Sequence, residues 1–404
     1  MTRYGRSPWV EAFPASRVPS HPKYKGAAQT GVVVVGAGLT GCLTAYAFAA
    51  AGVKVIVLET DRIGRGHTAF ASGWISEDPN APFNTVEDAI GLRAARRAWQ
   101  AWRRAALDFA ALLKRLDVKC HLDERGSVTI AATPEQTATL KKDLKARKEA
   151  GLDAAMLTSR AIKSDLMLDA AAGLRAKAGG TIDPYRAALG IAAAAADRGA
   201  QFFERSSVRK LTFTRKTLDV IADGGKIRAE RVVIATGLPR TLFKALARHF
   251  WFHTSYFALT DPVPAKIRRV LGNGGIVRDL AQPAHTIRWV DENRLLVNGA
   301  DGEVAPPRLR DNVVVQRTGQ LMYELSTLYP DISGIQPAYG WSADYTRTVD
   351  GLPFIGSHRN YPFHLFAFGD SSHSVTGSYL ASRIMLRQYS GETDPADASF
   401  GFHR

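Results

Sequence analysis

The chain has 404 residues and 46% of them are hydrophobic, so it is long enough for more than one domain with a substantial apolar core. No apolar run approaches the roughly 18 residues of a membrane-spanning helix, and the basic N-terminal stretch lacks the apolar segment of a secretory signal. The formal net charge is +15, but the basic residues have the spacing of solvated helix faces, so we expect no nucleic-acid binding. Two cysteines are too few for a disulfide framework, which favours a cytoplasmic location.

A strand, a glycine-rich turn, a helix and a second strand follow one another between residues 32 and 59. Four valines lead into the turn, Gly-Ala-Gly-Leu-Thr-Gly at 36–41, and a helix of small residues precedes the second strand, at 53–58. This strand ends on Glu59, about 20 residues beyond the glycines, where a carboxylate binds an adenosine ribose. The order predicts a βαβ unit that binds a dinucleotide; the alternative is a glycine-rich turn in another kind of α/β protein.

The three glycines of this turn have different tasks in such a unit. Gly36 permits the tight turn, and Gly38 lets backbone amides approach a pyrophosphate. Gly41 lets the helix pack closely on the sheet, and the helix N-terminus offers unpaired N–H groups to the anion.

Helical and extended patterns continue along the chain. Apolar residues at helical spacing, Leu107 and Phe109 among them, predict a long helical region over 85–116. A strand at 127–132, a helix from Pro134 and a further helical stretch ending near 173 follow. The later predictions are a helix from 184 capped by Asp183, a β-meander over 201–222, a strand at 231–237, a β-rich region over 250–315, a helix at 315–328, strands up to 369 and a helix over 374–389. Periodicity alone fits either one interrupted domain with an insertion or two consecutive domains.

Five segments, in the same order, resemble the FAD-dependent amine and amino-acid oxidoreductases of the D-amino-acid oxidase/glycine oxidase (DAO) family. They are the turn at 36–41 with Glu59, the loop at 62–73, Ile-Asp-Pro at 182–184 with the meander and Val-Val-Ile-Ala-Thr-Gly at 232–237, Thr-Val-Asp-Gly-Leu-Pro-Phe-Ile-Gly at 348–356, and Phe-Gly-Asp-Ser-Ser-His-Ser-Val-Thr-Gly-Ser at 368–378. The resemblance implies an α/β fold in which a Rossmann-like FAD-binding domain of the glutathione-reductase type is interleaved with an α+β substrate domain built on an antiparallel sheet. The implied boundaries are an N-terminal arm at 1–30, an FAD-binding domain at 31–80, 180–245 and 336–404, and a substrate-binding domain at 81–179 and 246–335.

The resemblance also implies that FAD is held along its whole length. The adenine end would lie at the first turn and Glu59, and the isoalloxazine between the 62–74 loop and the 369–378 turn, with the N-terminus of the last helix stabilising negative charge on the reduced flavin. Some relatives attach FAD covalently through a histidine near this loop, and His67 is a candidate for such a bond. The residues around His67 match those relatives poorly, so we expect non-covalent FAD. The expected FAD-binding residues are Gly36, Gly38, Leu39, Thr40, Gly41, Glu59, Thr60, Arg65, Gly66, His67, Thr68, Ala69, Ser72, Gly73, Val208, Ala235, Thr236, Gly237, Gly369, Asp370, Ser371, His373, Ser374, Val375 and Thr376.

The chain departs from the family pattern in two places. Serines stand in the last turn where relatives have glycines, which implies an altered backbone there. Amino-acid-binding relatives often carry an arginine before Asp-Gly-x-Pro; here Tyr345 stands at that position and Arg347 is the nearest substitute, unless it is a surface arginine. The candidate substrate-facing residues are therefore His373, Thr376, Arg347 and Trp74, although a turn histidine and a core or lid tryptophan are the structural alternatives.

The function that the resemblance implies is oxidation of the CH–NH bond of an amine or amino acid by hydride transfer to flavin N5. This chemistry needs no metal and no nucleophile–base pair, and the sequence contains no pattern for either. Oxygen, a quinone or an electron-transfer protein would accept the electrons. The alternatives are flavin-dependent oxidation of a hydroxy acid and a flavin-binding subunit without turnover of its own.

Overall fold

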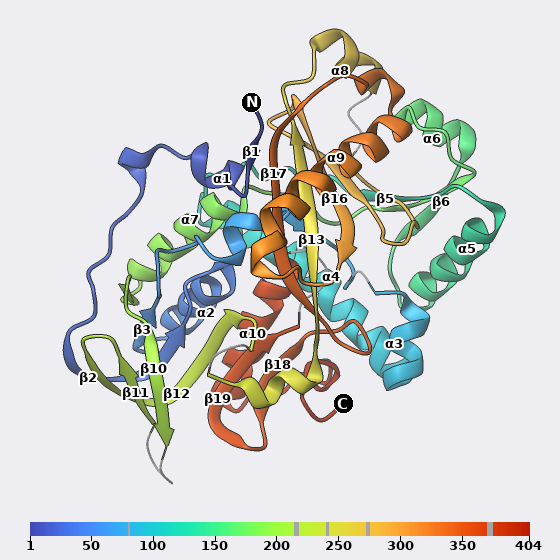
Figure 1. The fold of residues 1–404 in the computed structure, drawn as a ribbon. Coiled ribbons are helices and arrows are strands. Elements are labelled where there is room, and N and C mark those ends of the chain that lie inside the picture. Colours follow the sequence, from blue (N-terminus) through green and yellow to red (C-terminus); the bar gives the residue numbers. More distant parts are fainter. Residues whose placement is uncertain (80, 214–217, 240–241, 272–274, 370–374) are drawn as a thin grey trace. The chain divides into compact units, whose positions relative to one another are not determined.

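The structure, a computed structural model, describes residues 1–79, 81–213, 218–239, 242–271, 275–369 and 375–404 (Figure 1). The chain divides into two compact units, each assembled from segments far apart in the sequence. Unit 1 comprises residues 1–11, 123–180 and 252–345, and unit 2 comprises residues 12–122, 181–251 and 346–404.

Unit 2 is built around the predicted βαβ unit, which consists of β2 (Gly26–Val35), α2 (Leu39–Ala50) and β3 (Val55–Leu58). The strand β2 pairs in parallel with β3 and with β12 (Gly225–Gly237), and β19 (Tyr361–Phe368) pairs in parallel with β12. The valines at 32–35 are at most 6% exposed, as expected for a parallel strand covered on both faces. The other strands of unit 2 are β9 (Gln201–Phe203), β10 (Val208–Phe213), β11 (Leu218–Ala222) and β18 (Phe354–His358), with β4 (Trp74–Ile75) in a short ladder with β8 (Gly180–Thr181).

In unit 2, α2 packs against both α7 (Pro184–Ala196) and α10 (Thr376–Ser390), and α4 (Leu92–Arg115) packs on α10. Asp183 caps α7 as predicted, because its Oδ1 accepts the N–H groups of Tyr185 (2.9 Å) and Arg186 (3.0 Å). Burial of this carboxyl raises its pKa in spite of the capping bonds.

The predicted helical region over 85–116 is confirmed, and it consists of two helices, α3 (Phe83–Ile90) and α4. They meet at Gly91, whose φ of +80° ends α3 in a conformation that favours glycine. Leu107 is not part of the buried stripe: it is 50% exposed, whereas Phe109 is fully buried. Leu107 follows Trp102 by five residues, which turns its side chain by about 140° around the helix.

Unit 1 is built on a nine-stranded, mostly antiparallel sheet in the order β1-β17-β13-β16-β15-β14-β5-β7-β6. Apolar side chains on one face of this sheet form a core with α6, α8 and α9. The fold class predicted from the sequence is therefore confirmed: a parallel sheet of the dinucleotide-binding type and a mostly antiparallel second sheet. The elements are β1 (Arg3–Tyr4), α1 (Pro8–Glu11), β5 (Ser127–Ala131), α5 (Pro134–Glu149), β6 (Ala154–Thr158), α6 (Ser159–Leu166), β7 (Ala172–Ala176), β13 (Trp251–Thr260), α8 (Ala265–Leu271), β14 (Ile276–Arg278), β15 (Thr286–Val290), β16 (Arg294–Gly302), α9 (Arg310–Leu328) and β17 (Pro337–Arg347).

The helical stretch predicted to end near residue 173 is wrong, because β6, a short α6 and β7 occupy that region. Thr158 caps α6 and Met167, at φ 55°, ends it after eight residues. At the end of the sheet, β6 pairs with β7, and β7 pairs with both β6 and β5, so these segments are strands through their pairing in the sheet.

The bounds of the two units differ from those of the predicted domains, and the larger differences are at residues 1–30, 81–122 and 336–345. The first residues do not form a separate arm, since β1 pairs with β17 inside unit 1. Residues 81–122 belong to unit 2, because α4 packs on α10, where the rings of Phe109 and Tyr379 stack 5.7 Å apart. Residues 336–345 belong to unit 1 as part of β17.

Candidate functional site

The glycine-rich turn between β2 and α2 has the geometry predicted for it. Gly36 has a φ of +99°, and a Cβ at this position would lie 2.7 Å from the carbonyl oxygen of Ala235 in β12. A Cβ on Gly41 would overlap the carbonyl oxygen of Gly36. These two glycines are therefore needed for the turn itself. Gly38 is different, because a Cβ there would meet only Thr68 Oγ1, at 3.1 Å.

The carboxylate of Glu59 lies beside this turn, at the end of β3. One oxygen accepts the N–H of Ala37 (2.7 Å) and the other accepts the N–H of Asp61 (2.9 Å). The carbonyl oxygen of Glu59 accepts the N–H of Ser206 (2.8 Å), two residues before Val208. The predicted adenine-end residues Glu59 and Val208 are thus close together, although about 150 residues separate them in the sequence.

The loop after β3 folds back over the same turn. Thr68 Oγ1 accepts the N–H of Leu39 (2.8 Å), and the carbonyl oxygen of Ala37 accepts the N–H of Gly64 (2.9 Å). His67 lies against the end of β12, where a Cβ on Gly237 would be 2.9 Å from His67 Nδ1. The loop therefore bridges the glycine-rich turn and the Ala-Thr-Gly turn, of which Thr236 is exposed and Ala235 is 7% exposed.

The start of α10 contacts both the loop and α2. The N–H of Val375 donates to the carbonyl oxygen of Trp74 (2.8 Å), and the hydroxyl of Thr376 donates to the carbonyl oxygen of Ser76 (2.9 Å). Thr40 Oγ1 lies 2.8 Å from Ser378 Oγ. The segments around residues 40, 75 and 376 thus meet in unit 2, as the predicted flavin site requires.

The end of β19 completes this arrangement. Phe368 pairs with Gly237 of β12, and the next residue, Gly369, is buried with a φ of +86°. The predicted residues Asp370, Ser371, His373 and Ser374 lie outside the described residues.

The remaining predicted residues differ in exposure. Trp74 is 2% exposed and Thr376 is fully buried, whereas Arg347, at the end of β17, is exposed. Thr68, Ala69, Ser72 and Gly73 are buried in the loop, Arg65 is partly exposed, and Thr60, Gly66 and His67 are exposed.

These residues fit a dinucleotide such as FAD. The N-cap of α2 is Gly38, which has no side chain to cap the helix. Thr68 Oγ1 accepts the N–H of Leu39, and an anion would bind at the N–H groups of the residues that follow. Arg65 Nε is buried and has no hydrogen-bond partner among the described residues, a donor that a phosphate or ribose oxygen would satisfy. Cys42, at the start of α2, is fully buried, and burial together with the charge of Glu59 raises its pKa far above the usual range, so it packs as a neutral thiol.

Several residues that support the site were not identified from the sequence. Glu204 is 1% exposed, and its Oε1 accepts the N–H of Ile63 (3.0 Å) at the start of the loop. Ser76 Oγ accepts the indole N–H of Trp102 (3.1 Å) and donates to the carbonyl oxygen of Asp78 (2.7 Å). A buried carboxylate and a tryptophan on a distant helix carry no local pattern that distinguishes them from ordinary core residues.

Arg404, the last residue of the given sequence, also supports unit 2 and was not identified from the sequence. Its guanidinium donates to both oxygens of Asp350 (2.5 and 3.1 Å) and to the carbonyl oxygen of Leu352 (2.5 Å). Both side chains are under 10% exposed, so this buried ion pair fixes the Asp-Gly-Leu-Pro segment in unit 2.

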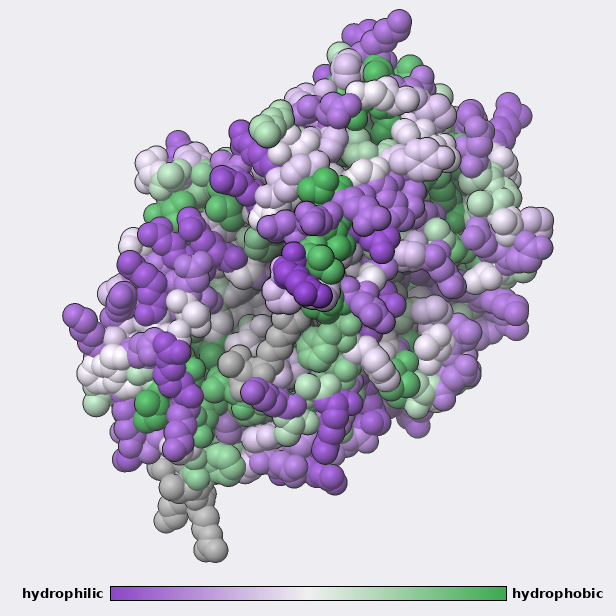
Figure 2. Space-filling view, in the orientation of Figure 1, coloured by the Kyte–Doolittle hydropathy of each residue, from purple (hydrophilic) through white to green (hydrophobic). Residues whose placement is uncertain are grey.

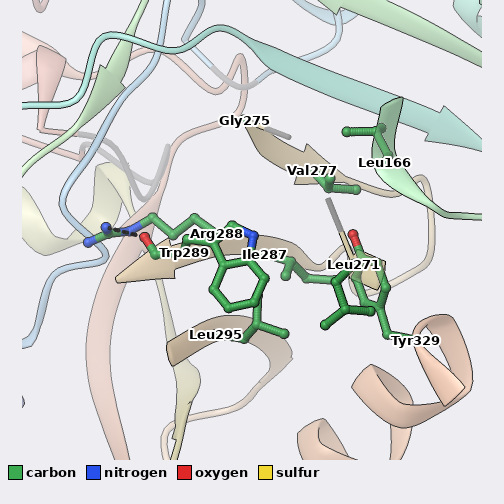
Figure 3. Close-up of a pocket in the computed structure, with 9 residues that line it drawn as sticks. All are labelled: Leu166, Leu271, Gly275, Val277, Ile287, Arg288, Trp289, Leu295 and Tyr329. Atoms are coloured by element: carbon green, nitrogen blue, oxygen red, sulfur yellow. Dashed lines mark hydrogen bonds between the residues drawn. The ribbon is translucent and has the colours of Figure 1, made fainter. Parts of the chain in front are cut away.

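A pocket in unit 1 lacks the features of a redox site. It lies between β14, β15, β16 and neighbouring helices. Figure 3 shows apolar side chains around it, among them Leu166, Val277 and Ile287, while the side chain of Arg288 extends away from them. Tyr329 supplies a buried hydroxyl whose pKa is raised by that burial. This pocket is therefore a gap in the apolar core of unit 1.

Two other kinds of site are absent from the part of the chain that the structure describes. No group of three or more His, Cys, Asp and Glu side chains has an arrangement that could hold a metal ion there. In the same residues, no helix has both the length and the hydropathy needed to span a membrane.

Comparisons with known proteins agree with this geometry. The sequence profile of the family described as "FAD dependent oxidoreductase" (DAO) matches residues 31–388. The chain is 26% identical over 373 residues to the γ-glutamylputrescine oxidoreductase of Escherichia coli, covering 91% of this chain and 85% of that protein. The crystal structure of glycine oxidase from Geobacillus kaustophilus is similar with a TM-score of 0.74 and 20% identity, covering 93% of this chain and 99% of that one. The L-amino acid deaminase of Proteus vulgaris is similar with a TM-score of 0.78 and 15% identity, covering 96% of this chain and 100% of that one.

The family profile matches most of the chain, and unit 2 has the glycine-rich turn, the Glu59 carboxylate at the end of β3 and the convergent loops. This protein is therefore a member of the DAO family of FAD-dependent oxidoreductases.

Proposed function

We propose that this FAD-dependent oxidoreductase oxidises the CH–NH bond of an amine or amino acid. Relatives that are named for amine or amino-acid substrates support this, since a γ-glutamylputrescine oxidoreductase and a glycine oxidase align with 91% and 81% of the chain. When bound, FAD supplies a hydride acceptor at N5, so the protein needs no metal and no nucleophile of its own.

The observation that carries the proposal is the convergence of several separated chain segments in unit 2. The turn at 36–41 and Glu59 would hold the adenosine and pyrophosphate, and the backbone near Val208 would hold the adenine. The loop at 65–74 and the turn at 235–237 would lie along the rest of FAD. We expect non-covalent binding, so acid precipitation of the protein should release all of the flavin.

The first helical turn of α10 has the most direct part in the proposed chemistry. Val375 and Thr376 are anchored to the carbonyl oxygens of Trp74 and Ser76, so the helix N-terminus is held rigidly beside the loop. A helix N-terminus carries a partial positive charge of roughly half an elementary charge, which stabilises a nearby anion on the helix axis. Thr376 therefore acts by holding this helix end in place, and we propose His373 as the neighbouring substrate contact.

Substrate orientation and water exclusion are the other tasks of the chain. Trp74 is 2% exposed and lies between the loop and α10, so we propose that it walls one side of the bound flavin. Arg347 is exposed, and we propose that it binds the carboxylate of a substrate that has one. Oxygen, a quinone or an electron-transfer protein would reoxidise the flavin.

Anaerobic flavin reduction tests this proposal. The FAD-loaded protein is mixed with amines, polyamines, N-methyl amino acids, D-amino acids and hydroxy acids, and the absorbance near 450 nm is followed. Bleaching by an amine or amino acid is expected. Bleaching by hydroxy acids alone would point to alcohol oxidation, and a protein that keeps FAD but bleaches with none of these would act as a flavin-binding subunit.

The role of Arg347 has a separate readout. Replacing it with methionine is expected to raise KM for carboxylate-bearing donors about tenfold or more and to leave KM for simple amines unchanged, because only the former lose a charged partner. An equal change for both classes would show that Arg347 does not bind the carboxylate.

A further inference from the structure

The helix α9 has an unusual distribution of charge for a helix on the surface of unit 1. Its charged residues beyond the first turn are Arg317 and Glu324, and both are directed toward the sheet. The guanidinium of Arg317 lies 5.9 Å from the ring centroid of Tyr256 in β13, and Glu324 Oε2 lies 2.9 Å from His285 Nε2. The two charges thus lie beside the buried apolar stripe of α9, which includes Val314, Leu321 and Leu325, and not on the solvent side of the helix.

The outer side of the same helix carries uncharged and apolar side chains. Val315 is 45% exposed and Tyr323 is 73% exposed, and between them Gly319 is exposed with no atom within 4 Å of a Cβ built on it. These three residues are four apart, so they lie on one stripe. Over residues 312–328, all of which the structure describes, the exposed residues include no Lys, Arg, Asp or Glu: they are Asn312, Val315, Gln316, Gly319, Tyr323 and Thr327.

This face is conspicuous because the rest of the chain is strongly basic, with a formal net charge of +15. Figure 2 shows hydrophobic side chains reaching the surface in the region where Figure 1 draws α9, with hydrophilic residues around them. Two copies of a basic protein repel one another, and an uncharged contact surface adds no further like-charge pairs to this repulsion. An uncharged, partly apolar helix face of this kind is therefore suited to a second copy of the chain.

The order of residues along α9 makes the face complementary to itself. In an antiparallel pair of α9 helices centred on Gly319, Val315 of each copy is opposite Tyr323 of the other, because both lie four residues from the centre. The open space at Gly319 lets the two backbones approach. The exposed Arg308 precedes α9 and the exposed Asp331 follows it, so an antiparallel pair brings these opposite charges to the same end of the contact, beside the exposed Arg310 and Asp311 of the first turn.

We propose that the chain forms a two-fold symmetric dimer through the α9 face, defined by Val315, Gly319 and Tyr323, with the two helices antiparallel and Gly319 near the axis. The partner is a second copy, since the apolar pairs and the charged ends then match on both sides.

Sedimentation equilibrium of the FAD-loaded protein tests the association. A mass of twice 43.9 kDa is expected, with the dimer dissociation constant raised about 100-fold or more in Val315→Glu and in Tyr323→Glu, since each places two buried charges in the contact. Leu107→Glu is the matched control, because Leu107 is also an exposed apolar residue, 50% exposed on α4, and it should leave the dimer intact. A monomer at all concentrations up to about 100 μM, or a dimer that both α9 variants leave intact, would overturn the proposal.

Cysteine cross-linking tests the geometry. Gly319→Cys should form an intermolecular disulfide under mild oxidation, because the two-fold axis brings position 319 of both copies together. The native Cys42 and Cys120 are fully buried and free, so they do not compete. Ser326→Cys is the control: it lies seven residues, about 10 Å along the helix, from the axis and should not cross-link to itself. Cross-linking at 326 but not at 319 contradicts the antiparallel arrangement, even if the α9 variants weaken the dimer.

Discussion

Gly38 is the residue at which cofactor binding and folding can best be separated. Its φ is not in the left-handed region, and an added Cβ meets only Thr68 Oγ1 at 3.1 Å, so the folded chain tolerates a side chain there with a small local shift. Binding of a pyrophosphate at the N-terminus of α2 is not compatible with a side chain at position 38, because that side chain would occupy the place of the pyrophosphate. Substitutions of Gly36 or Gly41 would disturb folding as well as cofactor binding, since side chains there collide with the backbone.

Gly38→Leu is therefore expected to lower the affinity for FAD at least about 100-fold while the circular dichroism spectrum stays unchanged. The ratio of absorbance at 450 nm to that at 280 nm measures the loss. The control is Gly302→Leu in unit 1, where an added Cβ lies 3.7 Å from Arg317 and FAD content should remain full. Full FAD in Gly38→Leu would show that the nucleotide lies elsewhere.

Arg404 and Asp350 form a buried ion pair, whereas Arg209 and Asp223 form a similar bidentate pair on the surface, with side-chain exposures of 66% and 42%. Removing one partner of a buried pair leaves an uncompensated charge, which costs about 3–5 kcal/mol, while exposed pairs contribute about 0–1 kcal/mol. Arg404→Met should thus lower the free energy of unfolding far more than Arg209→Met. Urea unfolding measures both, and equal effects would contradict the structural role of Arg404.

The strand β19 carries a histidine that should make stability depend on pH. His364 is 1% exposed among aromatic rings, and burial lowers its pKa to about 4. Because the unfolded chain binds the proton near pH 6.5 and the folded chain only near pH 4, stability is complete above the former value and falls as the pH drops through this window.

The expected loss from His364 is about 2 kcal/mol at pH 5 relative to pH 8. His364→Phe should reduce the slope of unfolding free energy against pH below 6.5; the pKa values of His249 and His358 are also lowered by burial, so some slope remains. His285 is the opposite case: burial would lower its pKa, but Asp279 and Glu324 together raise it. Its contribution is present below pH 6.5 and is lost as the pH rises, so His285→Gln should leave the acid slope unchanged. An unaltered acid slope in His364→Phe would contradict this assignment.

Elements with a strong local signal could be predicted from the sequence. The valines of β2, the capped helices α5 and α7 and the glycine turn all agree with the structure, because each is determined by residues close in sequence. The region at 154–176 could not be predicted, since β6 and β7 are strands only by pairing within the sheet of unit 1. Leu107 and Gly91 show the same limit at α4, where one apolar residue and one glycine are indistinguishable from others in a helical pattern.

For the molecule as a whole, the candidate site could be predicted only in part. Glycines and acidic residues in the order of the DAO family indicated which segments form the candidate FAD site. The structure brings residues 36–41, 59–76, 235–237 and 375–378 together in unit 2. The supporting residues Glu204, Trp102 and Arg404 lie far from these motifs in sequence and have no pattern of their own. Their roles follow from tertiary contacts alone.

We propose above all that one FAD is held by several separated segments of unit 2 at once. Hydrogen–deuterium exchange of the full-length protein, with and without FAD, is the most direct test of this arrangement. Slower exchange is expected in peptides covering 36–41, 60–78, 235–239 and 375–380, with little change in α5 and α6 of unit 1. Protection confined to the first of these segments, or found mainly in unit 1, would contradict it.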